Sequence, residues 1–76
     1  MTAKAFVLIN ADLGAEQDIL NEIRSIPHVT EVHVVYGVYD LVVKVEADTL
    51  QELKDTVFDR LRSLERVRST LTMPVV

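Results

Sequence analysis

The residues best suited to chemistry are Asp40, which stands three positions after Gly37, and two histidines, His28 and His33. An aspartate just beyond a turn can accept hydrogen bonds from nearby backbone amides, or it can direct its carboxylate to a ligand. Glycine suits such a corner because it adopts positive φ at little steric cost. The corner is therefore either a structural turn or a binding site, and these residues alone leave both interpretations open.

The two histidines indicate a site more weakly. No carboxylate has a metal-ligand spacing relative to both, so the sequence predicts no metal site. His33 could perform acid–base chemistry in a cavity between two sheets, as in small dimeric α+β enzymes. The chain offers no second catalytic partner and no glycine-rich phosphate loop. An enzyme that uses His33 is therefore the alternative, and the prediction is a protein with no catalytic residues and no cofactor.

A predicted β-hairpin holds the Gly37 corner. β-branched and aromatic residues crowd both sides of the glycine, which predicts strands over residues 29–36 and 41–45. Because side chains alternate between faces, each strand has a set directed to the core. These sets are Val32, Val34 and Tyr36 in the first strand and Leu41, Val43 and Val45 in the second.

The remaining elements follow from hydrophobic periodicity. The apolar run 4–10 predicts a strand covered on both faces, and residues at helical spacing predict a helix that ends before Pro27. Thr49 and Glu52 form a capping box at the start of a second helix over residues 50–64. The run 66–73 predicts a last strand, with Arg68, Thr70 and Thr72 on one face and Val67, Ser69, Leu71 and Met73 on the other.

This order predicts one α+β domain over residues 1–76, a ferredoxin-like βαββαβ sandwich in which two helices cover one face of a four-stranded antiparallel sheet. The other face stays bare. Strand 4–10 is apolar on both sides, so one of its two side-chain sets, together with Val35 and Val42, lies on that bare face. Exposed apolar surface of this kind marks a partner site, and we expect dimerisation through the bare face.

Composition narrows the function classes. The 76 residues carry a net charge of −4, which argues against direct binding to DNA or anionic lipid. The basic cluster Arg60, Arg62, Arg66 and Arg68 is interpreted as a solvated helix face. The chain contains no cysteine, which excludes disulfides, thiolate metal sites and cysteine nucleophiles. Its N-terminal apolar run is far shorter than the roughly 20 residues that span a bilayer. We expect a cytoplasmic protein that does not enter the membrane.

Three segments resemble the effector-binding domain of the Lrp/AsnC family. They are the Gly37-Val-Tyr39-Asp40 corner, the Ile26-Pro27-His-Val29 connection and the closing strand Val67-Arg-Ser-Thr70-Leu-Thr72. The resemblance implies a small-molecule sensing module that dimerises through its sheets, assembles further into rings, and binds an amino acid between subunits. It places the ligand contacts on Gly37, Tyr39, Asp40, Thr70 and Thr72. Asp40 would pair with the ligand's ammonium group, and the Gly37 corner and the threonine hydroxyls with its carboxylate.

The chain departs from the family's usual pattern at its N-terminus. Full-length members carry a helix-turn-helix domain ahead of this module, whereas here the first predicted strand begins within a few residues of Met1. We therefore expect a stand-alone module that acts on full-length Lrp/AsnC-type regulators by mixed assembly, with a segment of a longer protein as the alternative. A subunit that only oligomerises, without a ligand, remains a third class.

Overall fold

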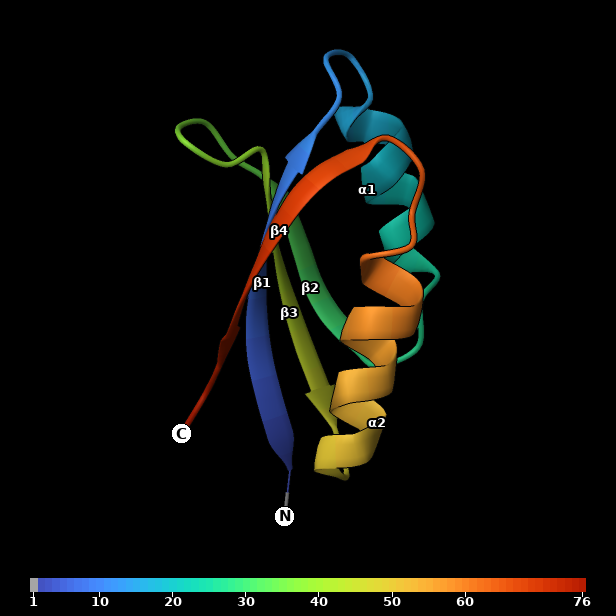
Figure 1. Ribbon diagram of the computed structural model, residues 1–76, viewed down its shortest axis with the longest axis vertical. Helices are drawn as coiled ribbons and strands as arrows, with labels where there is room; N and C mark the ends of the chain where they lie inside the picture. Colours follow the sequence, from blue (N-terminus) through green and yellow to red (C-terminus); the bar gives the residue numbers. More distant parts are fainter. Residues whose placement is uncertain (1) are drawn as a thin grey trace.

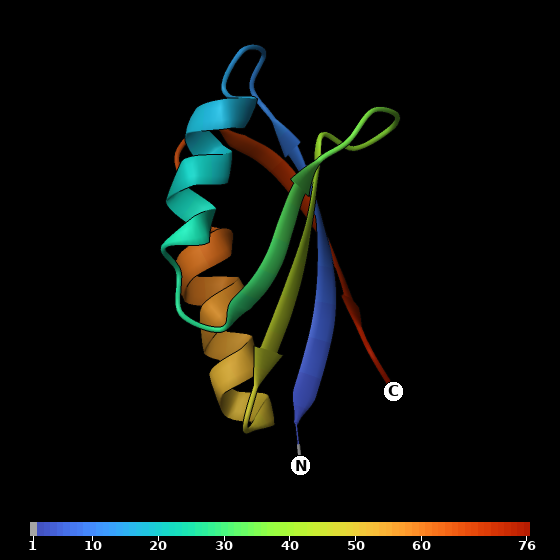
Figure 2. The same ribbon diagram turned by 180° about the vertical axis from the view of Figure 1, so that it is seen from behind.

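The computed structural model describes residues 2–76. Their elements, in chain order, are β1 (Ala3–Ala11), α1 (Glu16–Arg24), β2 (Val29–Val34), β3 (Leu41–Ala47), α2 (Leu50–Asp55), its π-helical continuation η1 (Thr56–Leu61), and β4 (Val67–Pro74). The strands form one antiparallel sheet in the order β2-β3-β1-β4. Both helices lie on the same face of this sheet, and the other face is uncovered (Figures 1 and 2). The predicted ferredoxin-like fold is confirmed.

The core lies between the helices and the two central strands. Alternate residues of β1 and β3 are buried there, as a strand with one covered face requires. Val7 pairs with Val43 across the sheet, and Ile19, Ile23 and Leu61 cover them from the helices. The core set predicted for the second hairpin strand, Leu41, Val43 and Val45, is fully buried. No helix within residues 2–76 is long and apolar enough to cross a bilayer.

A glycine turn precedes the first helix, and the second begins at the predicted capping box. Gly14 adopts a φ of 82° in the turn before α1, and Thr49 Oγ1 accepts the amide of Glu52 at 3.1 Å before α2. The second helix ends earlier than predicted, at Leu61, because the i→i−5 bond from Arg62 N to Val57 O closes a wide final turn. Leu64 therefore packs on the core from a turn rather than from the helix.

Two strand assignments were wrong. The second strand ends at Val34, so Tyr36, predicted as a core residue, leaves the sheet and is fully exposed. Val34, also predicted as a core residue, is 38% exposed at the end of this edge strand. The pairing of β4 with β1 shifts by one residue: Asn10 of β1 pairs with Ser69, and the next residue, Ala11, pairs with Val67, which leaves Arg68 as an extra residue in β4. This β-bulge turns Val67 to the core side, together with Thr70 and Thr72, and not to the opposite side as predicted.

Candidate functional site

Asp40 anchors the loop of the hairpin to the end of β1. Its Oδ2 accepts the backbone amide of Ala11 at 2.8 Å, and its own amide donates to the carbonyl of Ile9 at 2.9 Å. Its carbonyl accepts the amide of Val35 at 2.8 Å, which closes the loop. Asp40 thus performs the structural role that the sequence left open. The carboxylate uses Oδ2 for this bond.

The residues between these anchor points form a projecting loop, residues 35–39, which we call the arm. Gly37 adopts a φ of 136°, a conformation that residues with a side chain rarely adopt. Tyr36 is fully exposed, and 83% of Val38 is exposed, while Tyr39 is partly buried. Figures 1 and 2 both show the arm extending from the end of the sheet to the side away from the helices.

Thr70 and Thr72 lie on the other side of the sheet. They pair with Ile9 and Val7, whose side chains are buried beneath the helices, and both threonines are half-buried there. Thr72 borders a small apolar groove of about 120 Å³ between β4 and the second helix, together with Leu50, Leu53, Val57, Phe58 and Pro74. A single chain therefore brings Gly37, Tyr39 and Asp40 together, but it does not bring the two threonines to them.

The uncovered side of the sheet, which we call the open face, carries an apolar patch. Register places Leu8 between Val42 and Leu71, and Phe6 beside Met73. Phe6, Leu71 and Met73 are 37–44% exposed. The prediction that the uncovered face is apolar holds for Phe6, Leu8 and Val42. Val35, which was predicted on the same face, lies beyond the end of β2. Residues Phe6, Leu8, Val42, Leu71 and Met73 are called the apolar patch below.

Charged residues frame this patch in balanced pairs. Lys4 Nζ lies 3.4 Å from Glu46 Oε1, and Lys44 Nζ lies 3.7 Å from Glu31 Oε2. Register puts both pairs on the open face, where two positive and two negative charges cancel. The remaining charges of the chain, including Asp40, account for its net −4. The open face thus lacks the charge surplus that would select a strongly acidic or basic partner.

The histidines are separated and exposed to solvent. His33 Nε2 lies 3.4 Å from Glu31 Oε1 at the β2 edge, beside an open depression of about 320 Å³. His28 Nε2 lies 3.5 Å from Glu52 Oε2, near the start of α2. Within residues 2–76 no cluster of three or more histidine, aspartate or glutamate side chains could hold a metal ion. His33 has a carboxylate neighbour but does not face an enclosed cavity.

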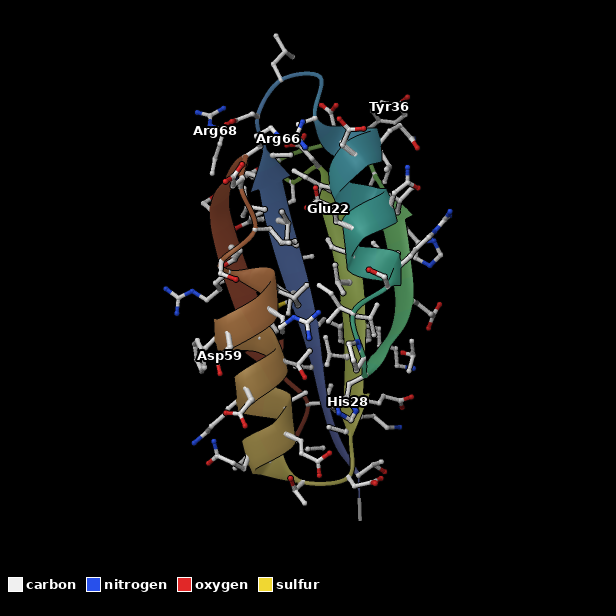
Figure 3. All side chains as sticks on the ribbon, turned by 90° about the vertical axis from the view of Figure 1, so that its right-hand side faces the viewer. Glu22, His28, Tyr36, Asp59, Arg66 and Arg68 are labelled. Carbon is white, nitrogen blue, oxygen red and sulfur yellow. The ribbon has the colours of Figure 1, made fainter. Side chains whose placement is uncertain are left out.

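Two of the four arginines of the basic cluster contact neighbouring side chains. Arg66 Nη1 lies 3.1 Å from Asp18 Oδ2, and Arg66 Nη2 lies 3.7 Å from Glu22 Oε1. Both carboxylates belong to α1, and Figure 3 labels Arg66 and Glu22. The guanidinium of Arg62 stacks 5.2 Å from the centre of the Phe58 ring. Periodicity did not predict the link from Arg66 to α1, because it joins residues 48 positions apart. All four arginines are exposed, but the interpretation as one helix face was wrong, because the helix ends at Leu61 and Arg62, Arg66 and Arg68 follow it.

Comparison with known proteins identifies relatives over the whole domain. The family model of the Lrp/AsnC ligand binding domain matches residues 4–76. PH1916, an HTH-type transcriptional regulator of Pyrococcus horikoshii, is 39% identical over 72 residues, which cover 91% of this chain and 48% of that protein. The chain thus spans about half the length of the curated relatives it matches.

Solved structures share the same fold. The crystal structure of FFRP-DM1 superposes with a TM-score of 0.92 at 36% identity, covering 97% of this chain and 99% of that one. The regulator NMB0573 from Neisseria meningitidis, solved as an L-Met complex, superposes with a TM-score of 0.84 at 20% identity over 97% of this chain and 49% of that one. At that identity the second likeness shows the fold alone.

Proposed function

This chain belongs to the family of Lrp/AsnC ligand-binding domains, and from that membership we propose that residues 1–76 form a single amino-acid sensing and oligomerisation domain without enzymatic activity. The domain modulates transcription through Lrp/AsnC-type regulators and does not itself bind DNA. The net charge of −4 supports the absence of direct DNA contact. The proposal includes a cytoplasmic location and requires no cofactor.

Dimerisation through the open face is the first part of this proposal. The apolar patch covers the centre of the uncovered sheet, and the paired charges around it cancel. A face with an apolar centre and a rim of equal positive and negative charges is complementary to itself, as a two-fold symmetric contact requires. A second copy of this chain is therefore the partner that fits best, with rings of dimers as the higher assembly.

An effector site between subunits is the second part. The observation that carries it is the separation of the candidate residues: the arm, which Asp40 anchors, extends to one side of the sheet (Figure 1), whereas Thr70 and Thr72 face the other. A pocket that uses all of them must therefore combine two chains. Because both copies in the face-to-face dimer keep their threonines on the helix side, this pocket belongs between neighbouring dimers of the proposed ring. Mixed assembly with full-length regulators would transmit the effector's presence to a DNA-binding partner.

The chemistry of these residues fits a zwitterionic amino acid. Asp40 Oδ1 accepts the ligand's ammonium group, while backbone amides near Gly37 and the hydroxyls of Thr70 and Thr72 bind its carboxylate. The complex of NMB0573 with L-Met is consistent with this ligand class, since that protein shares the fold. The side-chain pocket, and hence the preferred amino acid, depends on the neighbouring subunit.

Calorimetry with each of the common amino acids tests the proposal. Asp40→Asn keeps an oxygen for the amide of Ala11 but removes the negative charge, so we expect effector affinity to fall by about tenfold or more with the fold intact. Thr70→Val and Thr72→Val should weaken binding, whereas Thr2→Val, an exposed threonine outside the site, serves as the matched control. If the wild-type protein binds no amino acid, the sensing function is wrong.

A further inference from the structure

The arm exposes two large apolar side chains that its own chain does not cover. Tyr36 is fully exposed, and Val38 is 83% exposed. Both lie at the tip of a loop that extends toward the side of the open face (Figures 1 and 2). An exposed tyrosine is typical of an interface anchor, because aromatic residues are enriched among the residues that contribute most to binding, and Val38 adds apolar surface two positions later.

The arm is fixed at its base and therefore holds its direction. The bond from Val35 N to Asp40 O and the bond from Ala11 N to Asp40 Oδ2 attach both ends of the loop to the sheet. The register continues Asp40 into a polar row with Asn10 and Ser69, where Asn10 Nδ2 donates to Ser69 Oγ at 3.1 Å. The next row on this face is Leu8, Val42 and Leu71, so the base of the arm adjoins the edge of the apolar patch.

We propose that the arm of each subunit closes over the partner in the face-to-face dimer, with Tyr36 and Val38 buried against the partner's half of the interface. This inference rests on the dimer proposed above. Because the arm extends to the side of the open face, a second copy stacked on that face meets it. The partner supplies the apolar contact that Tyr36 and Val38 lack in the single chain.

The dimensions agree with this arrangement. Packed sheets lie about 10 Å apart. Two to three residues lead from the base of the arm to its tip, and at roughly 3.3 Å per residue for an extended chain they reach at most about 7–10 Å. The arm is therefore long enough to reach the partner's sheet but too short to pass through it.

Asp40 is the positioning residue in this arrangement. It bonds to β1 through both its backbone and its side chain, and it bonds to the first residue of the arm through its carbonyl. The arm also contains Gly37 and Tyr39, which we propose as effector contacts. Subunit pairing and effector binding thus share one loop, and Asp40 sets the orientation of that loop for both.

Sedimentation equilibrium of arm variants tests the inference. Tyr36→Ser should weaken the dimer by about tenfold or more, as expected for loss of an aromatic anchor. Leu13→Ser is the matched control, because Leu13 is equally exposed but lies on the loop before α1. Circular dichroism melts confirm that both variants fold. A dimer equally strong in both variants would overturn the arm contact.

A single tryptophan provides a second readout, because the chain contains none. We expect the emission of Tyr36→Trp to shift to shorter wavelength in the dimer, relative to the same variant carrying Leu8→Glu on the open face. Leu13→Trp should show no such shift. Unchanged Tyr36→Trp emission in a proven dimer overturns the arm inference alone. A wild-type protein that stays monomeric overturns the proposed sheet pairing as well.

Discussion

The carboxylate of Asp40 accepts a hydrogen bond of 2.8 Å from the backbone amide of Ala11, 29 residues earlier in the chain. Ala11 is buried and lies where the pairing of β1 with β4 shifts register. One side chain therefore serves the hairpin and the end of the central strand at once. A turn aspartate of this kind can be required for the fold and for ligand binding, and the two roles need separate variants.

Asp40→Ala should destabilise the protein by about 1–3 kcal/mol, because it leaves the Ala11 amide without its partner. Asp40→Asn retains an acceptor and should lose less than about 1 kcal/mol. Urea unfolding at one fixed protein concentration measures both, since a dimer's stability depends on concentration. Equal losses in the two variants would indicate that the negative charge, and not the hydrogen bond, stabilises the loop.

Leu8→Glu should produce a monomer. Leu8 lies at the centre of the apolar patch, between Val42 and Leu71, so a face-to-face dimer would have to bury the new carboxylate. Sedimentation velocity measures the change. Leu13→Glu introduces the same charge at an exposed loop position and should remain dimeric. Persistence of the Leu8→Glu dimer would place the interface elsewhere.

The same monomeric variant should bind the effector at least about tenfold more weakly although Asp40 is intact, because the proposed pocket needs a second chain. Calorimetry with the preferred amino acid compares Leu8→Glu with Leu13→Glu. Wild-type affinity in a monomer would mean that one subunit forms the whole site.

His28→Gly should be more stable than His28→Ala by about 1 kcal/mol. His28 has a φ of 74°, which glycine adopts without the steric cost that a Cβ incurs. Both variants lose the contact with Glu52, so their difference isolates the backbone contribution. Thermal unfolding measures it, and equal midpoints would show that the connection between α1 and β2 relaxes after substitution.

The fold could be predicted from the sequence because each element has a strong periodic signal. Leu41, Val43 and Val45 recur at every second position, and the capping threonine Thr49 marks the start of α2. The errors occur where a single residue changes the geometry. The bulge at Arg68 reverses the side on which Val67 lies, and no residue type in that stretch reports it. Tyr36 is typical of a strand by composition, yet the chain leaves the sheet two residues earlier.

The candidate site was predictable only in part. The proximity of Gly37, Tyr39 and Asp40 follows from their adjacency in the chain. Their separation from Thr70 and Thr72 depends on which face of β4 the threonines occupy, which sequence alternation alone does not determine. The bond from Ala11 to Asp40 joins distant segments and has no local pattern. The effector assignment stays a prediction, because a pocket between chains is not encoded in the periodicity of one chain.

The bulge in β4 has a consequence for how this domain tolerates changes in length. Asn10 faces Ser69 and Ala11 faces Val67, so Arg68 is the extra residue between two otherwise regular pairs. Deleting Arg68 would leave Val67 and Ser69 on their present sides of the sheet, whereas deleting Thr70 or Leu71 would turn part of the strand over. Deletion of Arg68 should therefore keep every side chain of β4 on its present face. Deletion of Thr70 or Leu71, in the same strand, should move core-facing side chains to the open face.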